Sequence, residues 1–263
     1  MDKLLTVRDV AEYLQVSKEK VYKLAQVGKI PVIKIENQWR FKRDRLDLWL
    51  EANEIGVTTL ELKVPTRQVN AQPFLKWAGG KGQLLSQYED LFPFEFRNYL
   101  EPFVGAGAVF FYFFNSGKLI NSQNITLLDS NSELVNCYRV IKRNLEELIN
   151  NLKDKKFLNE EKQYYKIRSE DPLDPIEKAA RMIYLNKTCF NGLYRVNGSG
   201  KFNVPYGKYK NPLICDSSNL EAVSMALKNV DIVCEDFTHC LGVAKRDDFV
   251  YFDPPYQPLN KTS

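Results

Sequence analysis

The chain has 263 residues, of which 44% are hydrophobic and 27% charged, and its formal net charge is only +4. This length allows one large domain and a small one, and the lack of a signal peptide or of ~18 consecutive uncharged apolar residues argues against a membrane partner. Five cysteines without paired spacing favour reduced thiols in the cytoplasm, and the small net charge excludes a strong basic field over the whole surface.

Residues 1–52 are predicted to form a module of their own. Thr6 and Asp9 have the spacing of a capping box, and apolar residues then recur at helical intervals through a first helix. A second helix follows a three-residue turn and is expected to end at Gly28. Short apolar runs on either side of residues 36–37 predict a two-stranded wing, and a short helix completes the module.

Two helices joined by a tight turn and followed by a basic wing resemble the excisionase and MerR-like winged helix-turn-helix family. This resemblance implies that the second helix enters the major groove of DNA. The DNA-binding residues that it implies are Lys18, Lys20 and Lys23 on the second helix and Arg40 in the wing. The alternative is a small packing module without a role in DNA binding.

A linker is predicted over residues 53–72, because most of this stretch lacks helical or strand periodicity and contains Pro65. The second domain is then expected to occupy residues 73–263. Its first motif, residues 76–81, places Trp77 and two lysines around a pair of glycines.

The next motif is a strand that breaks into a glycine-rich turn. Residues 99–101 predict the strand, and Gly105 and Gly107 occupy the turn before an apolar helix. Glycines at this point allow a ligand to approach the backbone and the helix N-terminus closely. Phe110 stands where the dinucleotide-binding pattern has its third glycine, which favours a cofactor without phosphates.

Acidic residues follow two further predicted strands. Residues 125–128 lead to Asp129, at the place where a doubly wound sheet commonly hydrogen-bonds ribose hydroxyls. Residues 231–234 are followed by Asp236 and Phe237, an acid and a ring suited to an adenine. Strands that alternate with helices predict an α/β fold with a doubly wound, Rossmann-like sheet.

The motif Asp253-Pro254-Pro255-Tyr256 follows the apolar run 249–252, which predicts a buried strand. This motif can hold an exocyclic amino group on a flat ring. The Asp253 carboxylate accepts one N–H, the Pro254 carbonyl accepts the other, and the Tyr256 ring stacks on the face.

Residues 178–215 are basic and aromatic, and they contain no Asp or Glu. Such a composition suits a surface that follows phosphates and stacks on bases. An ordinary solvated face is the alternative.

No metal site is expected. His239, the only histidine, lies between Cys234 and Cys240 in the sequence. Two thiols and one imidazole leave a structural zinc short of a ligand.

These motifs in this order resemble the Dam-type (class D12) DNA adenine-N6 methyltransferases. The resemblance covers residues 73–263, and residues 184–197 and 202–209 look like the family's target-recognition segment, here at about 140–230. It implies an S-adenosylmethionine-dependent methyltransferase fold with a helical recognition insertion, and double-stranded DNA as the substrate. The recognition segment looks most like that of relatives that methylate adenine within GATC, so this site is the expected target.

The resemblance also implies roles for individual residues. Those expected to bind S-adenosylmethionine are Trp77, Lys81, Phe103, Gly105, Gly107, Asp129, Asp236, Phe237 and Asp253. Arg195 would read a guanine in the major groove, where a bidentate arginine contact is the commonest specific one. The other residues expected at DNA are Leu193 and Pro205 beside neighbouring bases, Phe190 and Asn191 beside the flipped base, and Lys76 and Lys208 near the site.

The catalytic residues that the resemblance implies are Asp253, Pro254, Pro255 and Tyr256. Hydrogen bonds from adenine N6 to Asp253 and to the Pro254 carbonyl would favour a pyramidal nitrogen whose lone pair points at the methyl group. Transfer would then be direct, and the proton would leave afterwards through Asp253 or water. Stacking on Tyr256 would offset part of the few kcal/mol that flipping the base costs.

The chain ends soon after this motif, whereas family members continue with further strands and helices. We therefore expect the C-terminal strands to be missing and the strand before Asp253 to form an exposed apolar edge. A fragment, a split enzyme completed by a separate chain and an incomplete sequence are all compatible with this ending.

The sequence leaves three functions open. The first is an adenine methyltransferase acting at the bacterial nucleoid, alone or beside a cognate restriction endonuclease. The second is a DNA-binding regulator whose methyltransferase half binds cofactor or duplex without turnover. The third, methylation of RNA or protein, has less support, because glutamine methylation would favour Asn at the position of Asp253.

Overall fold

The computed structural model describes residues 4–26, 30–35, 38–52, 70–77, 79, 84–88, 91–93, 95–119 and 122–255. The predictions made for Gly28, residues 36–37, the linker residues 53–69, Lys81 and Tyr256 lie outside these ranges. The chain divides into two compact units, Met1–Pro65 and Thr66–Ser263, and each is described by itself. Within the described ranges, no helix has both the length and the apolar character needed to cross a membrane.

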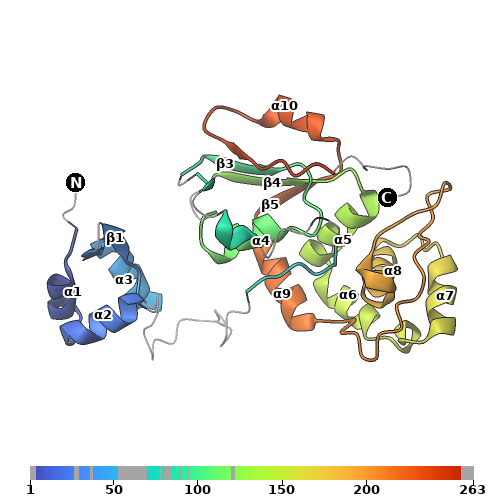
Figure 1. The fold of residues 1–263 in the computed structure, drawn as a ribbon, viewed down its shortest axis with the longest axis horizontal. Helices are drawn as coiled ribbons and strands as arrows, with labels where there is room; N and C mark the ends of the chain where they lie inside the picture. The colour runs from blue at the N-terminus through green and yellow to red at the C-terminus, as the bar shows by residue number, and fades with distance from the viewer. Residues whose placement is uncertain are drawn as a thin grey trace. The chain divides into compact units, whose positions relative to one another are not determined.

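The N-terminal unit combines helices with a short antiparallel hairpin (Figure 1). Its elements are α1 (Val7–Tyr13), α2 (Lys18–Gln26), β1 (Ile33–Ile35), β2 (Gln38–Arg40) and α3 (Arg43–Ala52). The predicted capping box is confirmed: the Asp9 N–H donates to Thr6 Oγ1 at 3.3 Å, and the Asp9 carboxylate accepts from the Thr6 N–H at 2.8 Å. Val10, Val21 and Phe41 are fully buried, so the helical spacing in the sequence forms the core of this unit.

The C-terminal unit is built on a parallel sheet with the strand order β5-β4-β3-β6 (Figure 1). Its strands are β3 (Asn98–Glu101), β4 (Asn124–Leu128), β5 (Val230–Val233) and β6 (Phe249–Val250). The strands predicted at residues 99–101, 125–128 and 231–234 are therefore confirmed to within one residue at each end.

The prediction of a buried strand over residues 249–252 is wrong in length and in burial. The strand stops at Val250, and the Phe252 side chain is 51% exposed. Phe249 and Val250 are only half-buried, because β6 pairs with β3 on one side and lies at the end of the sheet that the described residues form.

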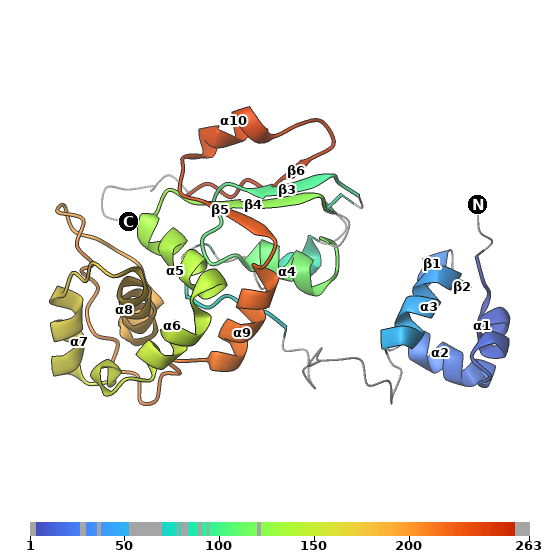
Figure 2. The same ribbon diagram turned by 180° about the vertical axis from the view of Figure 1, so that it is seen from behind.

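The side chains of each strand alternate between two cores on opposite faces of the sheet. Tyr99 and Leu127 belong to the larger core, whereas Leu100 and Leu128 pack with Cys240 in a smaller one. Figures 1 and 2 show the sheet between α10 (Cys240–Val243) on one face and α4 (Ala108–Asn115) and α5 (Ser132–Arg143) on the other. Helices on both faces of a parallel sheet confirm the predicted doubly wound α/β fold.

A helical region follows α5 in the chain. It comprises α6 (Leu145–Leu152), α7 (Glu161–Ser169), α8 (Pro175–Thr188) and α9 (Ser217–Ala226). The short 3₁₀ turns described in the C-terminal unit are η1 (Leu85–Gln87), η3 (Lys155–Phe157), η4 (Phe190–Gly192) and η5 (Phe237–His239). The Asp174 carboxylate caps α8 by accepting the N–H groups of Ile176 and Glu177. Helix α8 packs against α5 and α6, and its side chains from 179 to 186 are all buried, so it forms a firm support for the segment that follows it.

Two cations of α5 cover the outer edge of β5. Arg139 Nη2 donates to the Ile232 carbonyl at 2.9 Å, and Lys142 Nζ donates to the Val230 carbonyl at 2.7 Å. Because β5 is the terminal strand on this side of the sheet, these side chains satisfy backbone acceptors at its end.

Two asparagines fix the start of the C-terminal unit. Asn115 Oδ1 accepts from the Ala71 N–H at 3.1 Å, and its Nδ2 donates to the Ala71 carbonyl at 2.8 Å. Asn219 makes the equivalent pair of hydrogen bonds with Gln72. Ala71 is buried, so Ala71 and Gln72, which the sequence places in the linker, pack with this unit.

Candidate active site

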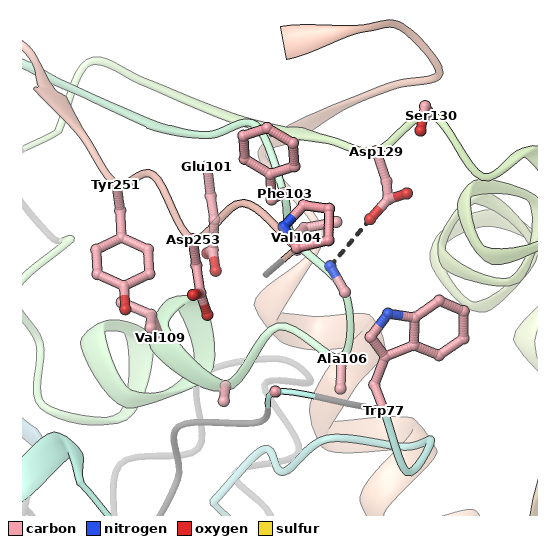
Figure 3. A pocket seen from close by; sticks show the side chains of 14 residues that line it. Trp77, Glu101, Phe103, Val104, Ala106, Val109, Asp129, Ser130, Tyr251 and Asp253 are labelled. Carbon is pink, nitrogen blue, oxygen red and sulfur yellow. Dashed lines mark hydrogen bonds between the residues drawn. The ribbon is translucent and has the colours of Figure 1, made fainter. Parts of the chain in front are cut away.

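A cavity of about 230 Å³ lies at the carboxyl ends of β3 and β4, beside the segment that follows β6 (Figure 3). Its lining residues are Trp77, Gly79, Glu101, Phe103, Val104, Gly105, Ala106, Ala108, Val109, Asp129, Ser130, Tyr251, Asp253 and Pro255. The sequence predicted five of them as cofactor contacts, namely Trp77, Phe103, Gly105, Asp129 and Asp253. They meet here because parallel strands present their carboxyl ends at the same edge of a sheet.

The turn after β3 requires its glycines. Gly105 and Gly107 have φ values of +49° and +75°, in the left-handed region. A Cβ on Gly105 would lie 2.9 Å from Trp77 Cδ1, and a Cβ on Gly107 would lie 2.6 Å from the Tyr138 hydroxyl oxygen. The backbone of Gly105 therefore forms part of the cavity wall next to Trp77, whereas Gly107 is the N-cap of α4 and does not line the cavity.

The Asp129 carboxylate is oriented by backbone N–H groups. Its Oδ2 accepts from the Gly105 N–H at 3.1 Å, drawn as the dashed line in Figure 3, and its Oδ1 accepts from the Asn131 N–H at 2.9 Å. Burial raises the pKa of Asp129, and these hydrogen bonds oppose that shift. The arrangement presents fixed acceptor oxygens at the cavity wall.

The Asp-Pro-Pro part of the predicted catalytic motif begins directly after Phe252. Asp253 and Pro255 line the cavity, and Asp253 is half-buried, whereas Pro254 is exposed. Figure 3 shows the carboxyl groups of Asp253 and Glu101 at the same end of the cavity.

Sequence reasoning gave no role to Glu101, which is 3% exposed at the end of β3. Burial raises the pKa of Glu101 to about 8, the hydrogen bond from the Tyr99 hydroxyl at 2.7 Å lowers it, and the charge of Asp253 raises it. The only local signal of a role for Glu101 was its position directly ahead of Pro102 and Phe103. Its burial leaves no local signal, because it depends on the packing of residues distant in the chain.

Asp236 and Phe237, predicted beside the adenine of the cofactor, do not line this cavity. The Phe237 ring stacks on Phe103, with 5.6 Å between ring centres and an interplanar angle of 27°. Asp236 is exposed, and its carboxylate accepts the Thr238 N–H at 2.8 Å, a hydrogen bond that lowers its pKa. Their contact with the cofactor stays a prediction.

The segment predicted to recognise DNA folds as an irregular hairpin. Its two sides pair through Val196 and Phe202, and the Asn203 N–H donates to the Arg195 carbonyl at 3.0 Å. The Arg195 side chain is exposed, and its Nε donates to Asn203 Oδ1 at 2.7 Å while its Nη2 donates to the Asn203 carbonyl at 3.3 Å. Asn203 thus fixes the direction of the guanidinium group.

Asn186 joins the start of the unit to this hairpin. Its Oδ1 accepts from the Lys76 N–H at 2.8 Å, and its Nδ2 donates to the carbonyls of Lys76 at 2.8 Å and Gly192 at 3.0 Å. The Lys76 side chain crosses Gly192 so closely that a Cβ there would lie 2.4 Å from Lys76 Cδ. Lys76 Nζ lies 5.0 Å from the centre of the Tyr209 ring, so this predicted DNA contact lies against the recognition segment.

The remaining predicted DNA contacts of this segment are all exposed: Phe190, Asn191, Leu193, Pro205 and Lys208. Asn191 and Lys208 have φ values of 55° and 54°, in the left-handed region. Non-glycine residues in this region are uncommon, and they occur in turns and cluster at functional sites. Their contact with bases or phosphates stays a prediction.

On the N-terminal unit, Lys18, Lys20 and Lys23 are exposed along α2. Arg40 in β2 is half-buried, and its Nη1 donates to the Trp39 carbonyl at 3.0 Å. The predicted recognition helix therefore presents three lysines to solvent, and their binding to DNA stays a prediction.

The two units match two different families. Residues 4–54 match the model of a helix-turn-helix domain, and residues 77–263 match that of the D12 class N6 adenine-specific DNA methyltransferases. The chain belongs to this D12 class. The predicted D12 family is confirmed, and the N-terminal match confirms a helix-turn-helix domain.

The D12 methyltransferase is similar in sequence to several named proteins. It is 47% identical over 212 residues to Type II methyltransferase M.MjaIII of Methanocaldococcus jannaschii, covering 74% of this chain and 72% of that protein. It is 44% identical over 204 residues to Type II methyltransferase M1.LlaDCHI of Lactococcus lactis subsp. cremoris, covering 74% and 69%. DNA adenine methylase of Haemophilus influenzae is 36% identical over 195 residues, covering 72% and 65%.

The D12 methyltransferase therefore methylates adenine in DNA and uses S-adenosylmethionine as the methyl donor. The chemistry of the cavity fits this cofactor. Trp77, Phe103 and Val109 offer an apolar wall, Asp129 offers oriented acceptors, and the bare backbone of Gly105 leaves room beside them. In the part of the chain that the structure describes, no group of three or more His, Cys, Asp or Glu side chains could hold a metal ion.

Proposed function

We propose that this methyltransferase acts on N6 of an adenine flipped out of a GATC site. The observation that carries the proposal is that Asp253 lines the same cavity as Trp77, Gly105 and Asp129. An acceptor for an amino group and the residues expected at the cofactor therefore face one space.

In this proposal the cofactor lies along the glycine-rich turn. Trp77 and Phe103 contribute ring faces, and Asp129 accepts hydrogen bonds from ribose hydroxyls. The N–H groups of Gly105 and Asn131 already hold that carboxylate in place, so little ordering is needed when the ligand enters. When bound, S-adenosylmethionine supplies an electrophilic methyl group.

Asp253 and Pro254 orient the nucleophile. Adenine N6 is a poor nucleophile, because its lone pair is delocalised into the ring. Hydrogen bonds from its two N–H groups to the Asp253 carboxylate and the Pro254 carbonyl favour a pyramidal nitrogen whose lone pair points along the line of transfer. Asp253 or water takes the proton that N6 loses, and Tyr256 stacks on the flipped ring.

Arg195 reads a guanine of the target in this proposal. Its two hydrogen bonds to Asn203 support the role, because a guanidinium that is already oriented loses less freedom when it binds a base edge. Phe190 and Asn191 are exposed at η4, where they can hold the duplex open beside the flipped base.

We also propose a role in a restriction-modification system, with a cognate restriction endonuclease as partner. Two relatives carry the name Type II methyltransferase, which supports this context. The exposed lysines of α2 would raise the concentration of the enzyme on DNA through phosphate contacts.

The test is incorporation of a labelled methyl group from S-adenosylmethionine into a duplex with GATC and into one without it. Asp253→Ala is expected to abolish incorporation, because the acceptor that orients N6 is removed. Glu95→Ala, at an exposed acid ahead of β3, is the control and is expected to keep full activity. Incorporation that requires both Asp253 and GATC supports the proposal.

Equal incorporation into both duplexes would contradict GATC as the target. No incorporation by the unsubstituted chain, with cofactor binding intact, would favour the alternatives of a DNA-binding regulator or one part of a split methyltransferase. Activity restored by a separate complementing chain would then distinguish the split enzyme from the regulator.

A further inference from the structure

A residue of the recognition hairpin forms part of the support of the cofactor cavity. The Trp77 ring, which lines the cavity, stacks on the Tyr194 ring with 5.0 Å between centres and an interplanar angle of 25°. Tyr194 is the neighbour of Arg195 in the chain. The expected guanine-reading residue and a wall of the cofactor cavity are therefore joined through one side chain.

Three contacts hold the Tyr194 ring. Besides the stack on Trp77, it packs edge-on against Phe202 with 5.9 Å between ring centres. Its hydroxyl donates to Glu133 Oε2 at 2.9 Å. Burial and the Glu133 carboxylate raise the pKa of Tyr194 to about 12, so the hydroxyl remains a donor at neutral pH. Because the ring is packed on three sides, a displacement of the hairpin is passed on to its other neighbours, including Trp77.

The Glu133 contact leads back to the cofactor cavity by a second route. Glu133 lies in the first turn of α5, and its Oε1 lies 3.6 Å from the Arg181 guanidinium. The cap of that helix, Asn131, donates its N–H to Asp129 in the cavity wall. Tyr194 thus contacts Trp77 directly and is connected to Asp129 through Glu133 of α5 and the Asn131 cap of that helix.

Trp77 has little room to move on its other side. A Cβ on Gly105 would lie 2.9 Å from Trp77 Cδ1, so the indole ring is confined between the glycine-rich turn and Tyr194. A shift of the hairpin on binding DNA must change the space open to Trp77. A ligand that presses on Trp77 must likewise act on the hairpin.

We propose that Tyr194 is a positioning residue that couples cofactor binding to DNA recognition, by joining Trp77 of the cofactor cavity to the hairpin that carries Arg195. This inference rests on the proposed function, in which these two residues contact cofactor and DNA. Thermodynamic linkage requires the coupling to be reciprocal, so DNA tightens cofactor binding by the same factor as cofactor tightens DNA binding.

The experiment measures this factor in the full-length chain by titration with S-adenosylhomocysteine, a non-reactive probe, with and without a saturating GATC duplex. The unsubstituted protein is expected to show a coupling factor in the usual range of roughly 5–150-fold. Tyr194→Leu removes the stack and should bring the factor close to one. Tyr13→Leu, at a tyrosine of α1 that is 38% exposed, is the matched control and should leave the factor unchanged.

Tyr194→Phe is the second variant, because Tyr194→Leu could fail to fold. It keeps the ring and removes only the bond to Glu133, so the factor should fall at least twofold while the protein remains folded. An unchanged factor in the folded Leu variant, or in the Phe variant if the Leu variant does not fold, overturns the inference, as does a factor of one in the unsubstituted protein. Failure of the unsubstituted protein to bind either ligand would instead contradict the proposed function.

Discussion

The Glu101 carboxyl group is an acid held where its charged form is disfavoured. It is buried at the end of β3, it accepts a hydrogen bond from the Tyr99 hydroxyl, and the Asp253 carboxylate faces the same cavity. Burial raises its pKa to about 8, so near neutral pH the neutral form predominates in the folded protein. Two carboxyl groups can therefore share one cavity without both carrying full charge.

This raised pKa predicts how stability varies with pH. Between about pH 4.5 and 8 the folded state keeps a proton on Glu101 that the unfolded state loses, so the free energy of unfolding falls as pH rises. The Glu101→Gln variant has no carboxyl group to ionise at this position, so its free energy of unfolding lacks this decrease. Relative to the unsubstituted protein, its free energy of unfolding should rise by about 3–4 kcal/mol between pH 5 and 8. Urea unfolding of both proteins across this range checks it, and parallel pH curves would contradict it.

At the scale of elements, Asn186 shows how one buried amide can join three segments. It lies on α8, is 2% exposed, and holds the backbone of Lys76 and of Gly192 in η4. The loop before the cavity and the turn expected beside the flipped base therefore share one anchor. Asn219 binds Gln72 in the same way, and its described side-chain hydrogen bonds do not involve η4, which gives a natural comparison.

We predict that Asn186→Ala and Asn219→Ala each lower the free energy of unfolding by about 2–4 kcal/mol, because each leaves backbone groups unpaired. Only Asn186→Ala should also weaken binding to a GATC duplex, by tenfold or more, since only it releases η4. Urea unfolding and a DNA titration at low temperature check both parts. Equal DNA affinities for the two folded variants would show that Asn186 acts on stability alone.

The sequence predicted those parts of the site that depend on local signals. The strand ends, Gly105, Asp129 and Asp253 follow from short motifs, and the rule that parallel strands meet at their carboxyl ends brings them together. The role of Glu101 was missed because its burial comes from tertiary packing. The stacking of Trp77 on Tyr194 was missed for the same reason, since residues far apart in a chain leave no local pattern when their rings stack.

Two predictions about elements failed or shifted for physical reasons. The apolar run 249–252 matches a buried strand in composition, yet only two residues pair, because a strand at the end of the sheet gains hydrogen bonds from one side. Ala71 and Gln72 lack periodicity and were assigned to the linker. Asn115 and Asn219 hold them by side-chain hydrogen bonds to their backbone, which periodicity cannot reveal.

At the scale of the whole molecule, the chain joins a helix-turn-helix unit to a methyltransferase unit, and each carries its own cationic side chains. Those of α2 (Lys18, Lys20 and Lys23) are expected to meet phosphates, whereas Arg195 is expected to read a base. The first group would contribute affinity without sequence preference, and Arg195 would contribute the preference.

The triple variant Lys18→Ala, Lys20→Ala and Lys23→Ala tests this division. Affinity for any duplex should fall, and the slope of log K against log salt should become shallower by roughly 0.9 for each phosphate that the variant no longer neutralises. The ratio of methylation rates on GATC and GATC-free duplexes should not change. Arg97→Ala, Lys245→Ala and Arg246→Ala together remove the same charge from exposed positions and serve as control. An unchanged affinity and slope would support a packing role for the N-terminal unit.

Arg139 and Lys142 also influence how copies of this protein meet one another. An uncovered edge strand offers a row of backbone groups on which a strand of another molecule can add, and this is a common start of aggregation. Because these two side chains occupy the Ile232 and Val230 carbonyls, an incoming strand finds those acceptors already bonded and meets positive charge instead. The same pair of cations that completes one edge of the sheet therefore protects the protein against self-association on that side.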